Sequence, residues 1–136
     1  MADISVTATA VKAALQPNVT TKLAGATITA GQTVYLDATT GKLMLADCDS
    51  ATIPARLPIG IALNGGAIDQ PIAVKTSGPV TFNAVLTAGA GFYQSGTPGG
   101  IAPIADQTTG DLLVLIGFAA STTVLNVDIQ AASVVL

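Results

Sequence analysis

The order of apolar and polar residues along the chain predicts a protein built mainly of β-strands. In VLNVDIQ, residues 124–130, apolar and polar positions alternate, as expected of a strand with one solvent-facing side. In LLVLIGF, residues 112–118, both faces are apolar, which predicts a central strand. Clusters rich in Gly, Pro, Asn, Ser and Thr separate such runs. Short strands at this spacing predict a compact antiparallel sandwich or barrel.

The chain contains an internal repeat. ATITAGQTVYLDATTGKLMLAD, residues 26–47, resembles AVLTAGAGFYQSGTPGGIAPIAD, residues 84–106. A shift of 58 positions makes seven of the eighteen pairs between 26–43 and 84–101 identical, and after a one-residue insertion the register resumes up to Asp47 and Asp106. The two copies are followed by the related segments PIGIAL and LIGFAA. The identical pairs are Ala26/Ala84, Thr29/Thr87, Ala30/Ala88, Gly31/Gly89, Tyr35/Tyr93, Thr39/Thr97 and Gly41/Gly99.

Each copy of the repeat is interpreted as a β-hairpin. TVYLD and KLMLAD flank the turn sequence ATTG, where Gly41 can adopt a positive φ at low steric cost. The second copy is expected to form the same hairpin around a longer Gly/Pro loop, with Tyr35 and Tyr93 at equivalent positions. Duplication of a hairpin unit then predicts two similar sheets packed face to face, each supplying half of the core.

The repeat divides the chain into an N-terminal arm, residues 1–24, and a single β domain, residues 25–136. The opening DISVTATAV alternates apolar and polar residues and is expected to be flexible in isolation. We expect residues 3–11 to order as a strand on the edge of a partner protein, with Ile4 and Val6 setting the register. An ordinary first strand of the protein's own sheet is the alternative. The candidate partner-binding residues are Asp3, Ile4, Ser5, Val6 and Thr7.

Composition points to association with other protein subunits. Half of the residues are hydrophobic, 10% are charged and 4% are aromatic, and the mean hydropathy is +0.64. The longest apolar stretch, 112–120, is too short to span a bilayer, so we expect other subunits to cover the apolar surface. The C-terminal AASVVL, residues 131–136, is a candidate for that contact or for a strand of the protein's own sheet. The N-terminus has no basic leader before a hydrophobic segment, so synthesis in a cytoplasm is expected.

Charge and residue types weigh against several functional classes. The net charge is −3 and the five basic residues are dispersed, so neither nucleic acid nor a membrane is expected as a partner. The chain has no histidine, which excludes Ser-His-Asp triads, Cys-His dyads and histidine metal ligands. Cys48 is the single cysteine, so there is no internal disulfide, and its neighbours Asp47 and Asp49 should disfavour the thiolate.

Residues 47–50 could be taken for a calcium loop, but the later glycine and the bidentate glutamate of an EF-hand are missing. A solvated acidic turn is the better interpretation. The sequence therefore nominates no catalytic residue, no cofactor-binding residue and no metal ligand, and an enzyme is not expected.

Three stretches resemble the small capsid decoration, or cement, proteins of tailed bacteriophages, of which the lambda type is the best known. They are AGQTVYLDATTGKL (30–43), IGIALNGGAIDQPIAVKTSGPV (59–80) and IGFAASTTVLNVDI (116–129), and the resemblance covers about residues 26–129. It implies a compact, mainly β module, described in some members as a β-tulip. It also implies a homotrimer on the outer surface of the phage head.

In that family the trimer clamps neighbouring major capsid proteins and stabilises the shell against internal DNA pressure. The resemblance thus implies a structural virion protein that is made in the host bacterial cytoplasm and needs no cofactor. A phage tail-tube or fibre subunit is an alternative. A small carbohydrate-binding β module is another, although it would need an exposed aromatic platform that five aromatic residues barely supply.

Overall fold

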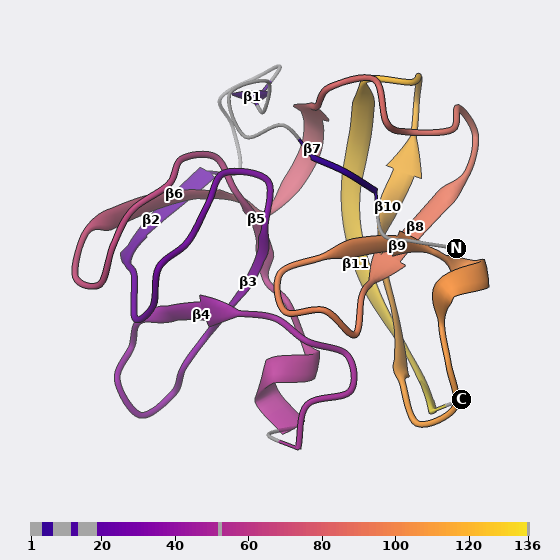
Figure 1. The fold of residues 1–136 in the computed structure, drawn as a ribbon. Coiled ribbons are helices and arrows are strands. Elements are labelled where there is room, and N and C mark those ends of the chain that lie inside the picture. The colour runs from indigo at the N-terminus through magenta and orange to yellow at the C-terminus, as the bar shows by residue number, and fades with distance from the viewer. Residues whose placement is uncertain (1–3, 7–11, 14–18, 52, 136) are drawn as a thin grey trace.

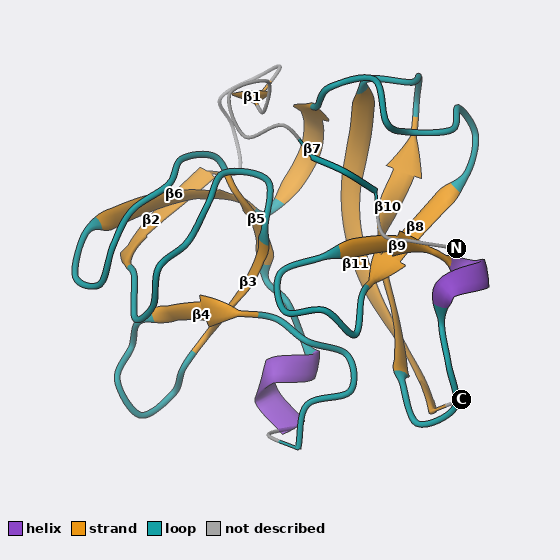
Figure 2. Cartoon of the chain, in the orientation of Figure 1, coloured by secondary structure: helices purple, strands orange, loops and turns teal. Residues whose placement is uncertain are grey.

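The protein is mainly β and consists of two antiparallel sheets joined in one chain (Figures 1 and 2). The computed structural model describes residues 4–6, 12–13, 19–51 and 53–135. Within these residues the sheets are not closed into a barrel, and their arrangement fits a sandwich. In the described part of the chain, two short 3-10 helices accompany the strands, η2 (Ile53–Arg56) and η3 (Ile104–Asp106). The mainly β sandwich expected from the alternation pattern is therefore confirmed.

The first sheet is formed by the N-terminal half of the chain and has the strand order β2-β6-β5-β3-β4. In Figure 1 it lies on the left, in indigo to magenta. Its strands are β2 (Val19–Leu23), β3 (Thr33–Leu36), β4 (Leu43–Leu45), β5 (Gly60–Ala62) and β6 (Pro71–Lys75).

The second sheet is formed by the C-terminal half and has the order β1-β7-β11-β10-β8-β9. Its two-residue edge strand β1 (Lys12–Ala13) pairs with Val80 and Thr81 of β7 and comes from the N-terminal segment. The expected central strand is confirmed as β10, which lies between β11 and β8. The other strands are β7 (Ser77–Thr81), β8 (Gly91–Gln94), β9 (Ile101–Pro103), β10 (Leu112–Ala119) and β11 (Val124–Val135).

Apart from β1, the two sheets have one topology. Numbered within its own half, each sheet reads first, fifth, fourth, second and third strand. The repeat visible in the sequence covers the second and third strands of each half and, through PIGIAL and LIGFAA, part of the fourth. The duplication thus extends from the hairpins to the complete five-stranded sheets, residues 19–75 and 77–135.

Strand register confirms that the two hairpins are equivalent. Tyr35 of β3 pairs with Met44, and Tyr93 of β8 pairs with Ala102, so both partners are displaced by the same 58 positions. Gly41 and Gly99, which occupy equivalent places before the returning strands, have φ values of 69° and 76°. The expectation of a longer second loop is wrong, because residues 37–42 and 95–100 both make six-residue connections. The extra residue follows β9.

The glycines of PIGIAL and LIGFAA occupy equivalent positions in the fourth strands. Gly60 of β5 pairs with Val34, and Gly117 of β10 pairs with Phe92. A Cβ atom on Gly60 would overlap the carbonyl oxygen of Lys75, and one on Gly117 would overlap that of Asn126. Both positions thus require glycine because the neighbouring strand approaches too closely for a side chain.

The hydrophobic core consists of two clusters rather than the single shared core expected. The first half encloses Ala24, Ile28, Val34, Leu43, Ala62, Ile72 and Val74. The cluster of the second half contains the repeat equivalents of six of these, Phe82, Leu86, Phe92, Ile101, Ala119 and Leu125. Ile61 of β5 is the one first-half residue buried in the second cluster. Each half therefore packs its own interior, and β5 joins the two.

The N-terminal boundary of the domain departs from the expected one, and the C-terminal segment follows one of the two interpretations given for it. β2 pairs with β6 from Val19↔Lys75 to Leu23↔Pro71, so the domain begins by Val19 rather than at residue 25. At the C-terminus, β11 runs to Val135 and pairs with β10 from Ala119↔Leu125 to Leu112↔Val135. The C-terminal segment thus adds to the protein's own sheet, which was the second of the two interpretations.

Candidate interaction surfaces

Backbone groups of both halves hydrogen-bond to one another at a junction between β3 and the β8–β9 connection. The Thr33 N–H donates to the Gly99 carbonyl at 3.0 Å, and the Gly99 N–H donates to the Ala46 carbonyl at 2.7 Å. The Cys48 N–H donates to the Ser95 carbonyl at 3.2 Å. The loop end of the second hairpin, where β8 ends and β9 begins, therefore lies against the open end of the first hairpin, where β3 begins and β4 ends.

Gln94 is the polar side chain at the centre of this junction. It is wholly buried, and its Nε2 donates to the carbonyls of Ala46, Ser95 and Gly100 at 2.9, 3.1 and 3.2 Å. Gln94 was not among the candidate residues that the sequence indicated. The sequence did contain one sign of its role. Gln94 is polar, whereas the equivalent residue of the first hairpin, Leu36, is apolar.

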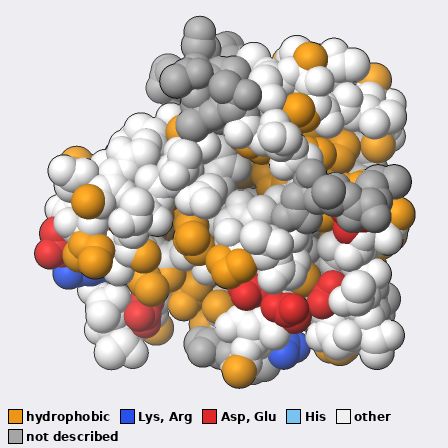
Figure 3. All heavy atoms as spheres, viewed as in Figure 1, with side chains coloured by type: hydrophobic (Ala, Val, Ile, Leu, Met, Phe, Trp, Pro, Cys, Tyr) orange, Lys and Arg blue, Asp and Glu red, His pale blue; other side chains and the backbone are white. Residues whose placement is uncertain are grey.

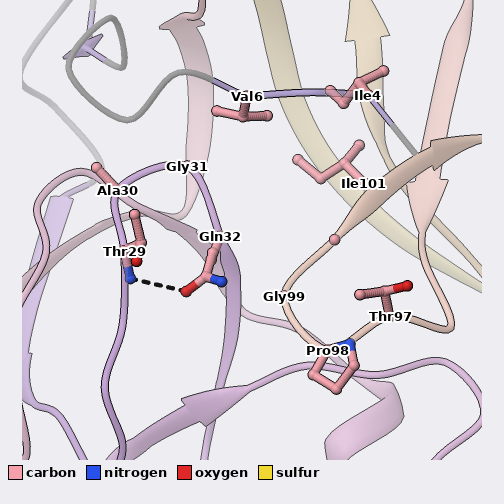
Figure 4. Close-up of a pocket in the computed structure, with 11 residues that line it drawn as sticks. Ile4, Val6, Thr29, Ala30, Gly31, Gln32, Thr97, Pro98, Gly99 and Ile101 are labelled. Carbon is pink, nitrogen blue, oxygen red and sulfur yellow. Dashed lines mark hydrogen bonds between the residues drawn. The ribbon is translucent and has the colours of Figure 1, made fainter. Parts of the chain in front are cut away.

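A pocket of about 250 Å³ lies beside the junction (Figure 4). The first half contributes residues 29–32, the second half contributes residues 97–101, and the N-terminal segment contributes Ile4 and Val6. The Thr29 N–H donates to Gln32 Oε1 at 2.8 Å and fixes the first of these loops. The lining residues that the structure describes include no Asp, Cys, Lys, Arg or Tyr.

The described part of the N-terminal arm lies against its own subunit. Ile4 and Val6 are half-buried and pack against the second cluster. The Ile4 N–H donates to the Ile101 carbonyl at 3.3 Å, and Asn83 Nδ2 donates to the Ser5 carbonyl at 2.8 Å. Figure 4 shows Ile4 and Val6 above Ile101. The other two candidate partner-binding residues, Asp3 and Thr7, lie outside the described residues, and binding of a partner by residues 3–7 stays a prediction.

The acidic turn around Cys48 forms a compact group with Asp111. The Asp49 N–H donates to Asp47 Oδ1 at 3.2 Å, as in an Asx turn. Burial, followed by hydrogen bonding to the Asp49 side chain, raises the pKa of Asp47 to about 6. Burial and the charge of Asp111 raise the pKa of the Cys48 thiol to about 12, and the thiol is fully buried. The disfavoured thiolate expected from the sequence is confirmed, with burial as the larger cause.

The described residues hold no group of three or more Asp and Cys side chains placed to bind a metal ion. The acidic turn therefore carries no metal assignment. In the same part of the chain, no helix has the length and apolarity needed to cross a bilayer.

Large apolar side chains are exposed on both halves. Figure 3 shows one face on which orange apolar side chains are scattered among white surface and charged side chains are few. Ile68, Phe118 and Ile104 are 60%, 53% and 52% exposed. Composition predicted exposed apolar surface but not its location, because the alternation of apolar and polar residues does not say which face of a strand a neighbouring element covers. The remaining members of this set are Leu23, Leu57 and Val135.

Comparison with known proteins gives no relative from which a function can be taken. No protein-family model matches the chain. No curated protein matches it significantly in sequence.

Proposed function

We propose that the chain is a structural virion protein, a homotrimeric capsid decoration or cement protein that binds the major capsid protein on the outer surface of a tailed-phage head. The observation that carries this proposal is the set of exposed apolar side chains on a surface with few charges. Leu23 and Ile68 lie on the first half and Ile104 and Phe118 on the second, each 45% to 60% exposed. Such surface favours protein–protein contact.

The duplicated sheets support a mechanical role. Antiparallel ladders and two packed clusters make a module whose strands are held along most of their length. A rigid module loses little conformational freedom on binding, so more of the interface energy remains for holding its partners together.

A decoration protein acts by adding interface area. DNA packed inside the head pushes the capsid subunits apart, and a trimer that bridges several of them must release its contacts before they separate. The protein supplies no chemical step in this mechanism. Its effect is a higher force or temperature for rupture of the shell.

The proposal is tested with expanded heads, empty and DNA-filled, of the phage that encodes the chain. Purified protein should co-sediment with empty expanded heads and saturate at a fixed ratio to the major capsid protein. It should also raise the temperature at which DNA-filled heads release their DNA, followed with a dye that fluoresces on binding DNA. Unexpanded proheads serve as the control. Absence of binding to expanded heads would overturn the proposal, and assembly of the purified chain into tubes would favour the tail-tube alternative.

A further inference from the structure

Two equivalent positions in the fourth strands have opposite exposure. Ile61 of β5 pairs with Thr33, and Phe118 of β10 pairs with Gly91, so the two residues occupy one place in the repeated topology. Ile61 is 0% exposed and lies in the cluster of the second half, whereas Phe118 is 53% exposed. The same place on the fold is thus covered in the first half and open in the second.

Their cross-strand neighbours show the same difference. Ile61 pairs with Lys75 of β6, and Phe118 pairs with Asn126 of β11. Paired residues of an antiparallel ladder point to the same side of the sheet. Lys75 is fully buried and Asn126 is exposed. We call Ile61 and Lys75 the covered face, and Phe118 and Asn126 the open face.

The element that meets the first half at the junction is the connection between β8 and β9, residues 95–100. In that connection Ser95 and Gly99 are buried; the Ser95 carbonyl accepts from the Cys48 N–H, and Gly99 is hydrogen-bonded to Thr33 and Ala46. Ile61 itself is buried in the cluster of the second half. Among the residues that the structure describes, no backbone hydrogen bond joins the equivalent connection of the first half, residues 37–42, to the second half. Gly41, the equivalent of Gly99, is exposed, and so are residues 38–40. One chain therefore has an open face and an exposed hairpin connection, residues 37–42. These are the repeat equivalents of the covered face and of the connection 95–100, which are both part of the contact between the two halves of one chain.

We propose that the first half of a second copy covers the open face, as the second half covers Ile61 within one chain, and that residues 37–42 of that copy are placed as residues 95–100 are placed within one chain. Phe118 is then the central contact, and Ile104, which follows β9 as Ala46 follows β4, lies beside it. The contact is heterologous, because it joins the second half of one copy to the first half of the next. The inference specifies the self-association in the proposed function and rests on that part of it.

A head-to-tail contact closes into a ring if its rotation permits, and otherwise continues as a filament. In a ring of three copies, six similar halves would alternate, each covering the face of its neighbour. The junction inside one chain and the contact between chains would then be two versions of a single interface.

The first experiment measures molar mass by light scattering during size-exclusion chromatography. The wild-type chain is expected at a multiple of 13.4 kDa, and Phe118→Ser at 13.4 kDa with unchanged circular dichroism. Ile68→Ser, which alters an equally exposed apolar residue in the β5–β6 connection, is the matched control and should keep the wild-type mass. A monomeric wild-type chain, or an oligomeric Phe118→Ser chain, overturns the inference. Should Phe118→Ser fail to fold, Ile104→Arg is read in the same way.

The second experiment tests the head-to-tail geometry. Thr39→Arg places a bulky charge on the exposed first connection while leaving Phe118 intact. Alone, Thr39→Arg and Phe118→Ser should each be monomeric. Mixed, they should form a dimer of one chain each, because one variant keeps a working open face and the other a working connection. If the mixture stays monomeric, or if one variant alone still forms dimers, the heterologous contact is refuted.

Binding to expanded heads separates failure of the inference from failure of the proposed function. A wild-type chain that is monomeric in solution and binds heads would leave the cement function standing and overturn the inference. A wild-type oligomer that Phe118→Ser disrupts, and that does not bind heads, would leave the inference standing and overturn the cement function.

Discussion

Thr33 Oγ1 donates a hydrogen bond to Gln94 Oε1 across the junction of the two halves, and both side chains are wholly buried. Thr33 begins β3 of the first sheet, and Gln94 ends β8 of the second. The amide of Gln94 also donates to the Ala46 carbonyl at 2.9 Å. At the equivalent position of the first hairpin stands Leu36, which packs against its own cluster. The position therefore holds a polar residue, Gln94, in the hairpin that contacts the first half, and an apolar residue, Leu36, in the hairpin that packs within its own half.

Replacing Gln94 with Leu should weaken the junction. The substitution removes the amide donor and leaves Thr33 Oγ1 buried without this acceptor, so the free energy of unfolding should fall by about 2 kcal/mol. Urea denaturation followed by circular dichroism measures the change. Gln130→Leu, at an exposed position of β11, is the control and should stay within about 0.5 kcal/mol of wild type. An unchanged Gln94→Leu midpoint would show that the amide is not what holds the halves together.

The sequence revealed the repeat only where backbone geometry preserves particular residues. Gly41 and Gly99 keep positive φ, and Tyr35 and Tyr93 keep their register, so identity survives there. The first and fifth strands keep only apolar character, as in Val74 and Leu125. The offset of the fifth strands also changes, because residues 63–70 join β5 to β6 whereas residues 120–123 join β10 to β11. The duplication of whole sheets could therefore not be detected from residue identity.

The sequence predicted that apolar side chains would be exposed, but not which residues would carry them. Low charge and high hydropathy predicted exposed apolar side chains. Ile61 and Phe118 both follow an Ile-Gly pair in an apolar run, and nothing local distinguishes the buried residue from the exposed one. The difference in exposure arises because the second half of the chain covers Ile61 of the first half, whereas Phe118 of the second half is left exposed. It is a property of tertiary arrangement and not of the strand.

Glycine at the fourth strands makes a prediction about stability. Gly60→Ala and Gly117→Ala would each force a methyl group against a neighbouring backbone carbonyl, so each should lower the free energy of unfolding by about 3 kcal/mol or prevent folding. In Gly91→Ala the nearest atoms lie at 3.4 Å, an ordinary contact distance, so this control should change stability by less than about 1 kcal/mol. Thermal denaturation of the three variants checks the order. Equal effects at all three positions would contradict it.

Cys48 is expected to be unreactive in the native protein. With a pKa of about 12, the thiolate fraction at pH 8 is about 10⁻⁴, and the sulfur is also shielded from solvent. Iodoacetamide should therefore modify almost no native protein in the time that fully labels protein unfolded in guanidinium chloride. Mass spectrometry of the intact chain measures the extent. Rapid native labelling would mean that the acidic turn opens readily.

The raised pKa of Asp47 predicts a pH dependence of stability. Its value is about 6 in the folded protein and 3.8 as the ordinary value, so the folded state binds this proton more tightly than the unfolded state. The Asp47 contribution is therefore unfavourable above pH 6 and disappears as the pH falls toward 4. Asp47→Asn, neutral throughout and still able to accept from the Asp49 N–H, should be more stable than wild type at pH 7. Unfolding midpoints at several pH values should show this advantage shrinking toward pH 4, and a constant advantage would contradict the assignment.

Deleting residues 1–14 tests the N-terminal arm as a tether to the capsid. The deletion removes Ile4 and Val6 from the second cluster, and because both are half-buried we expect a loss of about 1 to 3 kcal/mol in the free energy of unfolding. The sheets retain β2 to β11, so the truncated chain should still fold. If residues 3–7 also bind the capsid protein, the folded truncated chain will no longer co-sediment with expanded heads. The full-length double variant Ile4→Ala, Val6→Ala keeps the arm backbone for pairing and should retain partial binding. A folded truncated chain that decorates heads at full occupancy would show that the arm covers its own core and does not bind the shell.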